Sequence, residues 1–515
     1  MLHPGGAFVL KACIFTTGLA GIVAEYVMAT LASYLLGDAV RQWALTISLM
    51  LFSMGLGSRL SRNIRGALLD AFVGVELALS LLCAASALVT YSFAPYVENL
   101  APLIYLIAVA IGLLIGLEIP LVTRLNDWFE ELRLNISSVM EKDYYGALLG
   151  GLLFAFVALP RLGLTYTPIL LGSVNFVVAF LLFVRFREAL KFKKWLTVGF
   201  SVVSVLLFLL FILAEPITLF GEQQKYRDRV VFQKQTPYQK IVMTQWKQYF
   251  WLYLDGNEQF SSFDEERYHE PLVHPAMRLA AARERVLILG GGDGLALREV
   301  LKYDDVDSAV LVDIDAAVTQ LGRENPMLLE LNNDAFGDPR VEVVNGDGFV
   351  YLKESDQLFD VIIVDLPDPK TVSLARLYSR DFYRVAIHHL ARAGTLVTQA
   401  TSPFFSAKAF LCILKTLRAA GIPAVAYHNH IPTMGEWGWV LGQNRSDVKG
   451  SDLKSRLLEL CYDDQIDTRF LNREAMASML NFGKDAWKGF DQVEVNELLN
   501  LSLYRYYQEG FWGVY

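Results

Sequence analysis

The chain has 515 residues, of which 54% are hydrophobic and 19% are charged, with a formal net charge of −8 and a mean hydropathy of +0.34. This length is too great for one ordinary domain. The acidic balance argues against a nucleic-acid-binding protein, which normally needs a basic surface. The hydropathy is unevenly distributed along the chain, so we expect a membrane half followed by a globular half.

Long apolar segments alternate with short charged loops up to about Gly221. Each segment is near or above the roughly 20 apolar residues with which a helix crosses a bilayer. The sequence therefore predicts seven spanning helices, at residues 8–36, 43–60, 67–93, 103–122, 145–162, 168–184 and 196–214. The first segment is too long for a cleaved signal peptide and is expected to stay as an anchor. The small-residue pairs Gly112/Gly116 and Gly146/Gly150 predict close helix packing in a bundle.

Basic residues in the loops predict the orientation. Lys and Arg gather at residues 59–65, 124–142 and 185–194, and such loops usually lie in the cytoplasm. Seven spans would then place the globular half outside, although the substrates inferred below are cytosolic. We expect a multi-pass protein of the cell membrane with a cytoplasmic catalytic half, and the span count conflicts with this charge bias.

Three acidic residues, Glu25, Glu76 and Glu118, lie within the apolar segments. A charged group is costly inside a bilayer, so these side chains are expected to face the interior of the bundle. The alternative is a cation-binding role.

The globular half begins with two strand-like runs, QKIVMTQ and QYFWLYLDG, which predict a β-hairpin. Five short apolar runs then alternate with amphipathic helices: RVLILG, SAVLVDID, VEVVNGD, FDVIIVD and GTLVTQA. This alternation predicts a parallel, doubly wound α/β sheet of the Rossmann-like type. The expected domains are a multi-pass α-helical membrane domain at 1–221, a small β-hairpin domain at 222–275, the Rossmann-like domain at 276–445 and a helical tail at 446–515.

Glycines and aspartates follow four of these strands. They are the turn GGGDG at 290–294, Asp313, Asp347, and the pair Asp365 and Asp368. Ligands of such sheets bind at the carboxyl ends of the strands. Glycines let the backbone turn sharply and approach a ligand. We expect Asp313 to bind ribose hydroxyls and Asp347 an adenine amino group, with helix capping as the alternative for each acid taken alone.

The acid within the glycine turn, Asp293, indicates which sulfonium compound the turn would bind. S-adenosylmethionine carries a carboxylate, which Asp293 would repel, and an ammonium group, which it would attract. Decarboxylated S-adenosylmethionine carries only the ammonium group, so the turn favours it. Asp365 and Asp368 lie three residues apart in VDLPDP. A primary amine is mostly protonated at neutral pH, with a pKa of about 10.4 for lysine, and paired carboxylates can hold it and accept its proton.

From about residue 239 to 442 the sequence resembles the spermidine synthase (polyamine aminopropyltransferase) family, most closely its membrane-anchored branch. The resemblance rests on YLDGNEQFSSFDEERYHEPLVHPAM, VLILGGGDGLALREVLKY, LVDID, FDVIIVDLPDP and LYSRDFY. It implies a small β domain before a Rossmann-like domain, often in a homodimer. It also implies transfer of the aminopropyl group of decarboxylated S-adenosylmethionine, the co-substrate, to putrescine, giving spermidine and methylthioadenosine without a metal or other cofactor.

The resemblance assigns roles by motif. It implies donor binding by Gln239, Gly290, Gly292, Asp293, Asp313, Gly346 and Asp347. It makes Asp365 the catalytic base and Asp368 the group that holds the acceptor amine. Tyr268 would orient the attacking nitrogen, and His269 and Glu258 are expected beside the substrate.

Departures from the family pattern leave the acceptor open. His269 stands where glutamine is usual, Met434 where an aromatic residue often shapes the diamine pocket, and Leu295 where a second glycine follows the turn. The loop DLPDPKT also lacks the serines of the soluble enzymes. Putrescine is the default acceptor, and a longer or different amine is the alternative.

Two other functions stay open at this point. One is a methyltransferase on the same scaffold, and the other is a polyamine transporter or sensor that uses the globular domain for binding only. A metal site is not predicted, because His428 and His430 have no third ligand nearby. The cysteines Cys13, Cys83, Cys412 and Cys461 are scattered, so no disulfide framework is expected either.

Overall fold

A computed structural model describes residues 5–512 of the chain, apart from 37–38, 95, 98, 128–130, 446, 448, 461 and 463–465. The chain divides into two compact units, Met1–Val230 and Val231–Tyr515. The division lies a few residues after the predicted end of the membrane half at residue 221. Of the four cysteines, Cys461 lies outside the described residues, and Cys13, Cys83 and Cys412 are free and buried.

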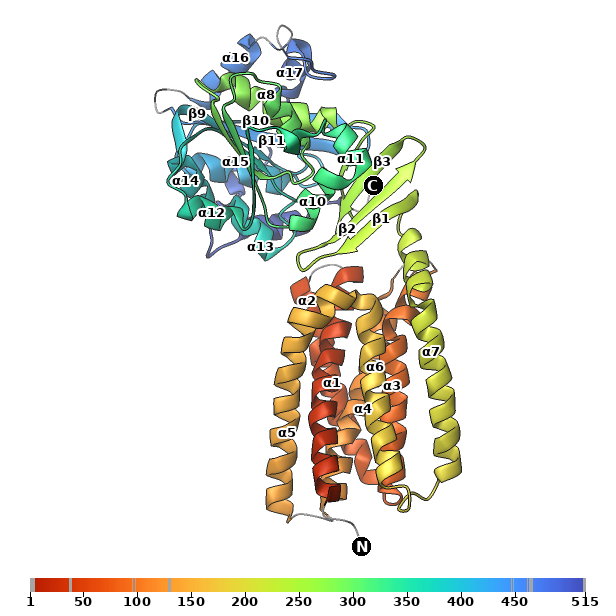
Figure 1. Cartoon of the computed structure of the whole chain (residues 1–515). Helices are drawn as coiled ribbons and strands as arrows, with labels where there is room; N and C mark the ends of the chain where they lie inside the picture. The colour runs from red at the N-terminus through yellow and green to blue at the C-terminus, as the bar shows by residue number, and fades with distance from the viewer. Residues whose placement is uncertain are drawn as a thin grey trace. The chain divides into compact units, whose positions relative to one another are not determined.

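The first unit is a bundle of long helices (Figure 1). These are α1 (Gly5–Leu36), α2 (Ala39–Leu60), α3 (Leu68–Phe93), α4 (Ala101–Asn126), α5 (Leu132–Leu153), α6 (Leu159–Arg185) and α7 (Lys193–Gln223). A 3₁₀ turn, Ser61–Asn63, follows α2, and a π-helical turn, Phe154–Ala158, joins α5 to α6. By length and composition, six helical stretches could cross a membrane: Phe8–Leu36, Val40–Asn63, Leu68–Phe93, Ala101–Asn126, Arg133–Arg185 and Lys193–Gln223.

The number of stretches differs from the seven predicted segments because one stretch contains two of them. Arg133–Arg185 has 53 residues and includes the predicted segments 145–162 and 168–184. Gly163 interrupts its helical geometry with φ 62° and ψ −169°. This break lies inside α6, close to the π-helical turn that separates α6 from α5, and the two run as separate helices in Figure 1.

Small residues bring the helices together, as the sequence predicts. A Cβ atom at Gly116 of α4 would lie 2.1 Å from the carbonyl oxygen of Met54 in α2, and one at Gly146 of α5 would lie 2.0 Å from that of Phe15 in α1. Only glycine permits such an approach of two backbones. The predicted pairs are therefore confirmed as helix contacts.

The acidic residues of the apolar segments face the interior of the bundle, which confirms that prediction. Glu25, Glu76 and Glu118 are all buried. The large side chains on the outside of the bundle are apolar instead: Phe52, Leu106, Phe156, Trp195 and Phe208 are among the exposed ones.

The second unit starts with a small antiparallel sheet in the order β1-β2-β3-β4. Its strands are β1 (Arg229–Gln235), β2 (Lys240–Trp246), β3 (Tyr249–Leu254) and β4 (Asn257–Ser261). The predicted hairpin is confirmed as β2 and β3, which pair antiparallel from Ile241↔Leu254 to Trp246↔Tyr249. One strand is added on each side of the hairpin.

The large sheet has seven strands in the order β10-β11-β9-β8-β5-β6-β7. They are β5 (Arg285–Gly290), β6 (Ser308–Asp313), β7 (Val341–Asn345), β8 (Phe359–Asp365), β9 (Leu390–Gln399), β10 (Ala424–Ile431) and β11 (Gly435–Gln443). The five predicted strands are parallel, as expected. The prediction of a wholly parallel sheet was wrong, however. The strands β10 and β11 form a hairpin, and β11 pairs antiparallel with β9.

Helices cover both faces of this sheet (Figure 1). They are α8 (Glu266–Leu279), α9 (Leu295–Leu301), α10 (Ala316–Glu324), α11 (Pro326–Leu331), α12 (Gly348–Glu354), α13 (Val372–Ala375), α14 (Arg380–His388), α15 (Ala407–Ala419), α16 (Gly450–Glu459), α17 (Arg473–Met479) and α18 (Ser502–Gln508). Short 3₁₀ helices occur at Ala335–Gly337, Arg376–Tyr378 and Phe490–Gln492.

Alternate residues of each central strand enter two different cores, as the pleat of a strand requires. Ile288 of β5 packs in the core that contains α8, α9, α16 and α17, whereas Leu289 packs in the core that contains α12, α14, α15 and α18. The segment beyond residue 446 thus contributes to both cores, through Leu457 on one face and Leu503 on the other. It is an integral part of the second unit.

The two glycines near the end of α2 give a matched test of helix packing. A Cβ at Gly57 would lie 2.1 Å from the carbonyl oxygen of Leu113, whereas a Cβ at Gly55 would meet nothing within 4 Å. We expect Gly57→Ala to lower the melting temperature of the detergent-solubilised chain, because such overpacking costs about 1–3 kcal/mol. Gly55→Ala should leave it unchanged or raise it slightly. Equal melting temperatures for the two variants would contradict this packing.

Candidate active site

Four strand ends lie side by side at one edge of the large sheet. The sheet order places β8, β5, β6 and β7 next to one another. Gly290 at the end of β5 is in register with Asp365 at the end of β8, and Asp313 of β6 is in register with Asn345 of β7. The glycine turn and the predicted aspartates are therefore brought to one edge, as the sequence indicates.

The glycine turn lies directly against the end of β8. Gly290 and Gly291 have φ of 86° and 64°, in the left-handed region that favours glycine. A Cβ at Gly290 would lie 2.0 Å from the backbone oxygen of Asp365. The N–H of Gly291 donates to that same oxygen at 3.1 Å. No other residue could occupy position 290 without moving β8.

Asp293 is nearly enclosed, with 9% of its surface exposed. Its Oδ1 accepts the N–H of Leu295 at 2.8 Å, so it supports the start of α9. Burial raises the pKa of Asp293, and the nearby positive charge of His269 partly opposes this rise. No hydrogen bond to Oδ2 is found among the described residues.

Asp313 is held by the backbone of its neighbours. Its two oxygens accept the N–H of Gly292 at 3.1 Å and that of Asp315 at 2.8 Å. Burial raises the pKa of Asp313 to about 6. Gln239 lies close by, because its Nε2 donates to Asp315 Oδ2 at 3.1 Å. Asp315 thus links Gln239 to the end of β6, a contact that was not anticipated from the sequence.

Asp347 performs the capping role that was the alternative. Its Oδ1 accepts the N–H of Phe349 at 2.8 Å and of Val350 at 3.2 Å, at the start of α12. Its Oδ2 forms an ion pair with Arg376, which the sequence did not suggest. A contact of Asp347 with adenine stays a prediction. Gly346 donates its N–H to the backbone oxygen of Asp313 at 2.9 Å and has open space on its Cα.

Asp365 is fixed by a tyrosine from α8. The hydroxyl of Tyr268 donates to Asp365 Oδ1 at 2.8 Å. Desolvation raises the pKa of Asp365 to about 6, against the opposing effect of His269, and the negative charge of Asp293 raises it further. A carboxyl group with this pKa is mostly ionised at neutral pH and can accept a proton.

Three side chains to which the sequence analysis assigned no role hold Asp368 and its loop. The hydroxyl of Tyr507 donates to its Oδ2 at 2.9 Å, and Gln399 Nε2 lies 3.3 Å from its Oδ1. Tyr378 anchors the loop before it by donating to the backbone oxygens of Leu366 and Pro367. Desolvation raises the pKa of Asp368 to about 6, and the hydrogen bond from Tyr507 limits the rise.

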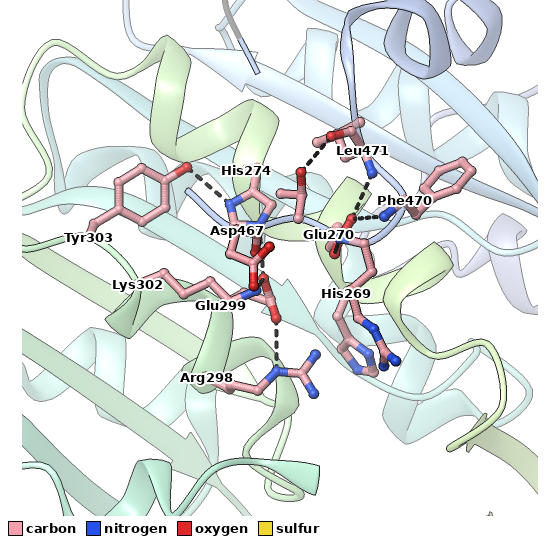
Figure 2. Close-up of polar contacts among 12 residues, drawn as sticks. His269, Glu270, His274, Arg298, Glu299, Lys302, Tyr303, Asp467, Phe470 and Leu471 are labelled. Atoms are coloured by element: carbon pink, nitrogen blue, oxygen red, sulfur yellow. Dashed lines mark hydrogen bonds and ion pairs between the residues drawn. The ribbon is translucent and has the colours of Figure 1, made fainter. Parts of the chain in front are cut away.

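His269 lies at one end of a buried series of alternating charges. His269 Nδ1 is 2.8 Å from Glu265 Oε2, and Arg298 donates to Glu265 at 2.8 and 3.0 Å. Arg298 also binds Glu299, whose other oxygen is 2.8 Å from His274 Nε2. Figure 2 shows part of this series between α8 and α9. The sequence analysis assigned a role only to His269, although its partners lie within two of the quoted motifs, at Glu265 and His274 and at Arg298 and Glu299.

The charge of His269 follows from this arrangement. Burial alone would lower its pKa, but the hydrogen bond and negative charge of Glu265 raise it overall, and Asp293 and Asp365 add to the rise. Glu265 thus favours the protonated form of His269, whose charge would interact favourably with Asp293 and Asp365. The expected contact of His269 with substrate stays a prediction.

The neighbouring Glu270 anchors a distant segment instead. Its carboxylate accepts the backbone N–H groups of Arg469 (2.6 Å), Phe470 (2.9 Å) and Leu471 (2.7 Å). Figure 2 shows the contacts with Phe470 and Leu471. These charge-assisted bonds hold the segment beyond residue 446 against α8.

The other residues singled out in the sequence lie in the small sheet and in the β10–β11 hairpin. Glu258 is in β4, and burial raises its pKa to about 7. His428 and His430 both approach Glu436 of the β10–β11 hairpin, which accounts for them as ion-pair partners. Met434 packs on the core beside α8.

Comparison with known proteins identifies the family. A family model described as Spermine/spermidine synthase domain matches residues 265–452. Polyamine aminopropyltransferase 2 of Aquifex aeolicus is 44% identical, over 97% of this chain and 98% of that protein. The polyamine aminopropyltransferase of Leptospira interrogans is 38% identical over 95% of each chain. A crystal structure of spermidine synthase with the transition state analogue AdoDATO is 26% identical, with a TM-score of 0.46, over 51% of this chain and 89% of that one.

Both relatives cover nearly the whole chain, and each is more than 30% identical to it. The resemblance of the strand-end motifs is thereby confirmed. The chain belongs to the spermidine synthase family and is a polyamine aminopropyltransferase, an enzyme that transfers aminopropyl groups in polyamine biosynthesis.

Proposed function

We propose that the chain is a membrane-bound spermidine synthase that transfers the aminopropyl group of decarboxylated S-adenosylmethionine to putrescine. The observation that carries this proposal is the placement of Asp293 and Asp365 at the ends of neighbouring strands, with Asp368 three residues further on. Three carboxylates at one edge suit substrates that are all cationic.

The donor end of the site uses the glycine turn. Backbone N–H groups and Asp313 are suited to the nucleoside, and the partly unpaired carboxylate of Asp293 suits the ammonium group at the end of the aminopropyl chain. A donor that retained its carboxylate would bring a second negative charge to this enclosed position. Asp293 would attract the ammonium group of either compound, but it would repel the carboxylate that only S-adenosylmethionine carries. Decarboxylated S-adenosylmethionine is therefore favoured.

The acceptor end uses the acid pair. Asp368 holds one ammonium group of the diamine, and Asp365, fixed by Tyr268, takes a proton from the attacking amine. The nitrogen attacks the propyl carbon next to sulfur, and the carbon–sulfur bond breaks as the carbon–nitrogen bond forms. The bonding electrons pass to sulfur, which leaves as the neutral thioether methylthioadenosine. A sulfonium group is already a good leaving group, so this route uses no metal or other cofactor.

The test is a turnover assay on the detergent-purified full chain with putrescine and each sulfonium donor. We expect methylthioadenosine and spermidine from the decarboxylated donor only. Methylated product from S-adenosylmethionine would indicate a methyltransferase. No turnover, together with polyamine flux in proteoliposomes, would indicate a transporter. In the same assay Asp365→Asn should lose about 10²–10⁴-fold in turnover, the usual contribution of a general base.

The control for Asp365→Asn is Asp356→Asn, which removes the same charge from an exposed loop. Calorimetry should show that both variants still bind the donor. Lost donor affinity in Asp365→Asn would mean that this residue serves the nucleotide and not the proton transfer.

The pH profile should show the raised pKa values of the acid pair. Both acids act as carboxylates, so activity is present above their pKa and is lost as the pH falls through it. With each pKa near 6, kcat/KM for putrescine should fall below about pH 6, well above the value of about 3.9 for an ordinary aspartate. The melting temperature over the same range serves as control. A fall only near pH 4 would contradict the desolvated acid pair.

The exposed surface of the helical unit supports a place in the membrane. On α7, the residues Trp195, Val205, Phe208 and Phe211 are all more than half exposed, and apolar surfaces of this size on a monomer usually contact lipid or another protein. We infer lipid as the contact, because the helices have the length of a bilayer. The homodimer that the resemblance implies stays a prediction.

The number of crossings can be measured by impermeant thiol labelling in a variant whose native cysteines are replaced by serine. Cysteine is introduced at Arg62, between α2 and α3, or at Arg227, after α7; both are exposed. If the chain crosses separately in α5 and α6, five crossings separate these positions and they are labelled from opposite sides. Labelling from the same side would mean that Arg133–Arg185 crosses once.

A further inference from the structure

The C-terminal helix α18 reaches into the acid pair. The hydroxyl of Tyr507 donates to Asp368 Oδ2 at 2.9 Å, although the two residues are 139 positions apart. Tyr507 lies beyond residues 265–452, the part that the family model matches. Its contact with the acid therefore adds to what the family motifs describe.

Several contacts fix α18 in this place. The ring centroids of Tyr507 and Trp512 are 4.7 Å apart, and Trp512 Nε1 donates to the backbone oxygen of Tyr507 at 3.1 Å. Trp512 also contacts Phe405, which follows β9. Gln508 Nε2 donates to the backbone oxygen of Lys370, two residues after Asp368, at 3.3 Å. The helix is thus attached to the acid-bearing loop as well as to the acid.

The tyrosine contributes to the orientation of the carboxylate. Oδ2 of Asp368 accepts from Tyr507 and Oδ1 faces Gln399 Nε2, so each oxygen keeps a lone pair that can accept from an ammonium group. Fixing the Asp368 side chain strengthens its binding of an alkyl ammonium group, because the side chain loses less conformational entropy when the ligand binds. The aromatic ring of Tyr507 also adds an apolar surface beside the charge.

We propose that Tyr507 is a positioning residue of the acceptor site, which aligns Asp368 to hold the terminal ammonium group of an aliphatic diamine. The C-terminal segment thereby completes the acceptor end of the site, while the donor end is built without it. This inference rests on the proposed function for the identity of the diamine.

The test compares Tyr507→Phe with Tyr506→Phe in the full chain. Both tyrosines are 8% exposed on the same helix, and the Tyr506 hydroxyl accepts the N–H of Glu494 at 3.1 Å, away from Asp368. Each variant therefore loses one buried hydroxyl with a hydrogen bond. Putrescine binding, donor binding, turnover and melting temperature are measured for both and for the unchanged chain.

We expect Tyr507→Phe to weaken putrescine binding and to raise its KM about tenfold, the effect of losing one hydrogen bond to a charged group. Its kcat should change much less, and its donor affinity and melting temperature should match those of Tyr506→Phe. Equal putrescine affinity in the two variants would overturn the inference. So would a loss of donor affinity specific to Tyr507→Phe.

The same measurements distinguish a failure of this inference from a failure of the proposed function. If the unchanged chain binds putrescine but gives no spermidine, the proposed function fails, and weaker binding in Tyr507→Phe alone still supports the inference. If it makes spermidine and both variants keep the same KM for putrescine, the proposed function stands and the inference fails. No putrescine binding and no turnover by the unchanged chain would overturn both.

Discussion

The contact between the glycine turn and the end of β8 is the constraint on which the site depends. The backbone oxygen of Asp365 occupies the space that a Cβ at Gly290 would need, and it also accepts the N–H of Gly291. The donor turn and the proposed base are thus joined through main chain, without an intervening flexible side chain. An alkyl transfer needs nitrogen, carbon and sulfur to be aligned, and a rigid junction between the two half-sites provides such alignment.

This junction has an electrostatic cost, because it gathers carboxylates in a desolvated place. Asp293, Asp313, Asp365 and Asp368 all have raised pKa values for this reason. Glu265 raises the pKa of His269, and the protonated form of His269 opposes the rise at two of these acids, Asp293 and Asp365. The remaining negative potential suits a sulfonium donor and a diammonium acceptor, which supply the missing cations when they bind. The site is in this sense complementary to its substrates before they arrive.

The sequence predicted which strand ends converge, but it did not predict the long-range contacts that these residues make. The carboxyl ends of parallel strands meet at one edge, so aspartates that follow successive strands must converge, and Asp313 and Asp365 do so. The ion pair of Asp347 with Arg376 could not be found in this way, because it joins a strand end to a distant 3₁₀ helix. The antiparallel β10–β11 hairpin was missed for a similar reason, since its place beside β9 depends on long-range pairing.

The two ends of the proposed site differ in how each is built. Apart from Gln239, the proposed donor end comes from one run of strands and turns, residues 285–347, in which chain order and sheet order agree. The proposed acceptor end draws on four separate segments, which contribute Tyr268 of α8, the loop around Asp368, Gln399 of β9 and Tyr507 of α18. A substitution in any one of these segments would therefore change the proposed acceptor end while leaving the glycine turn in place.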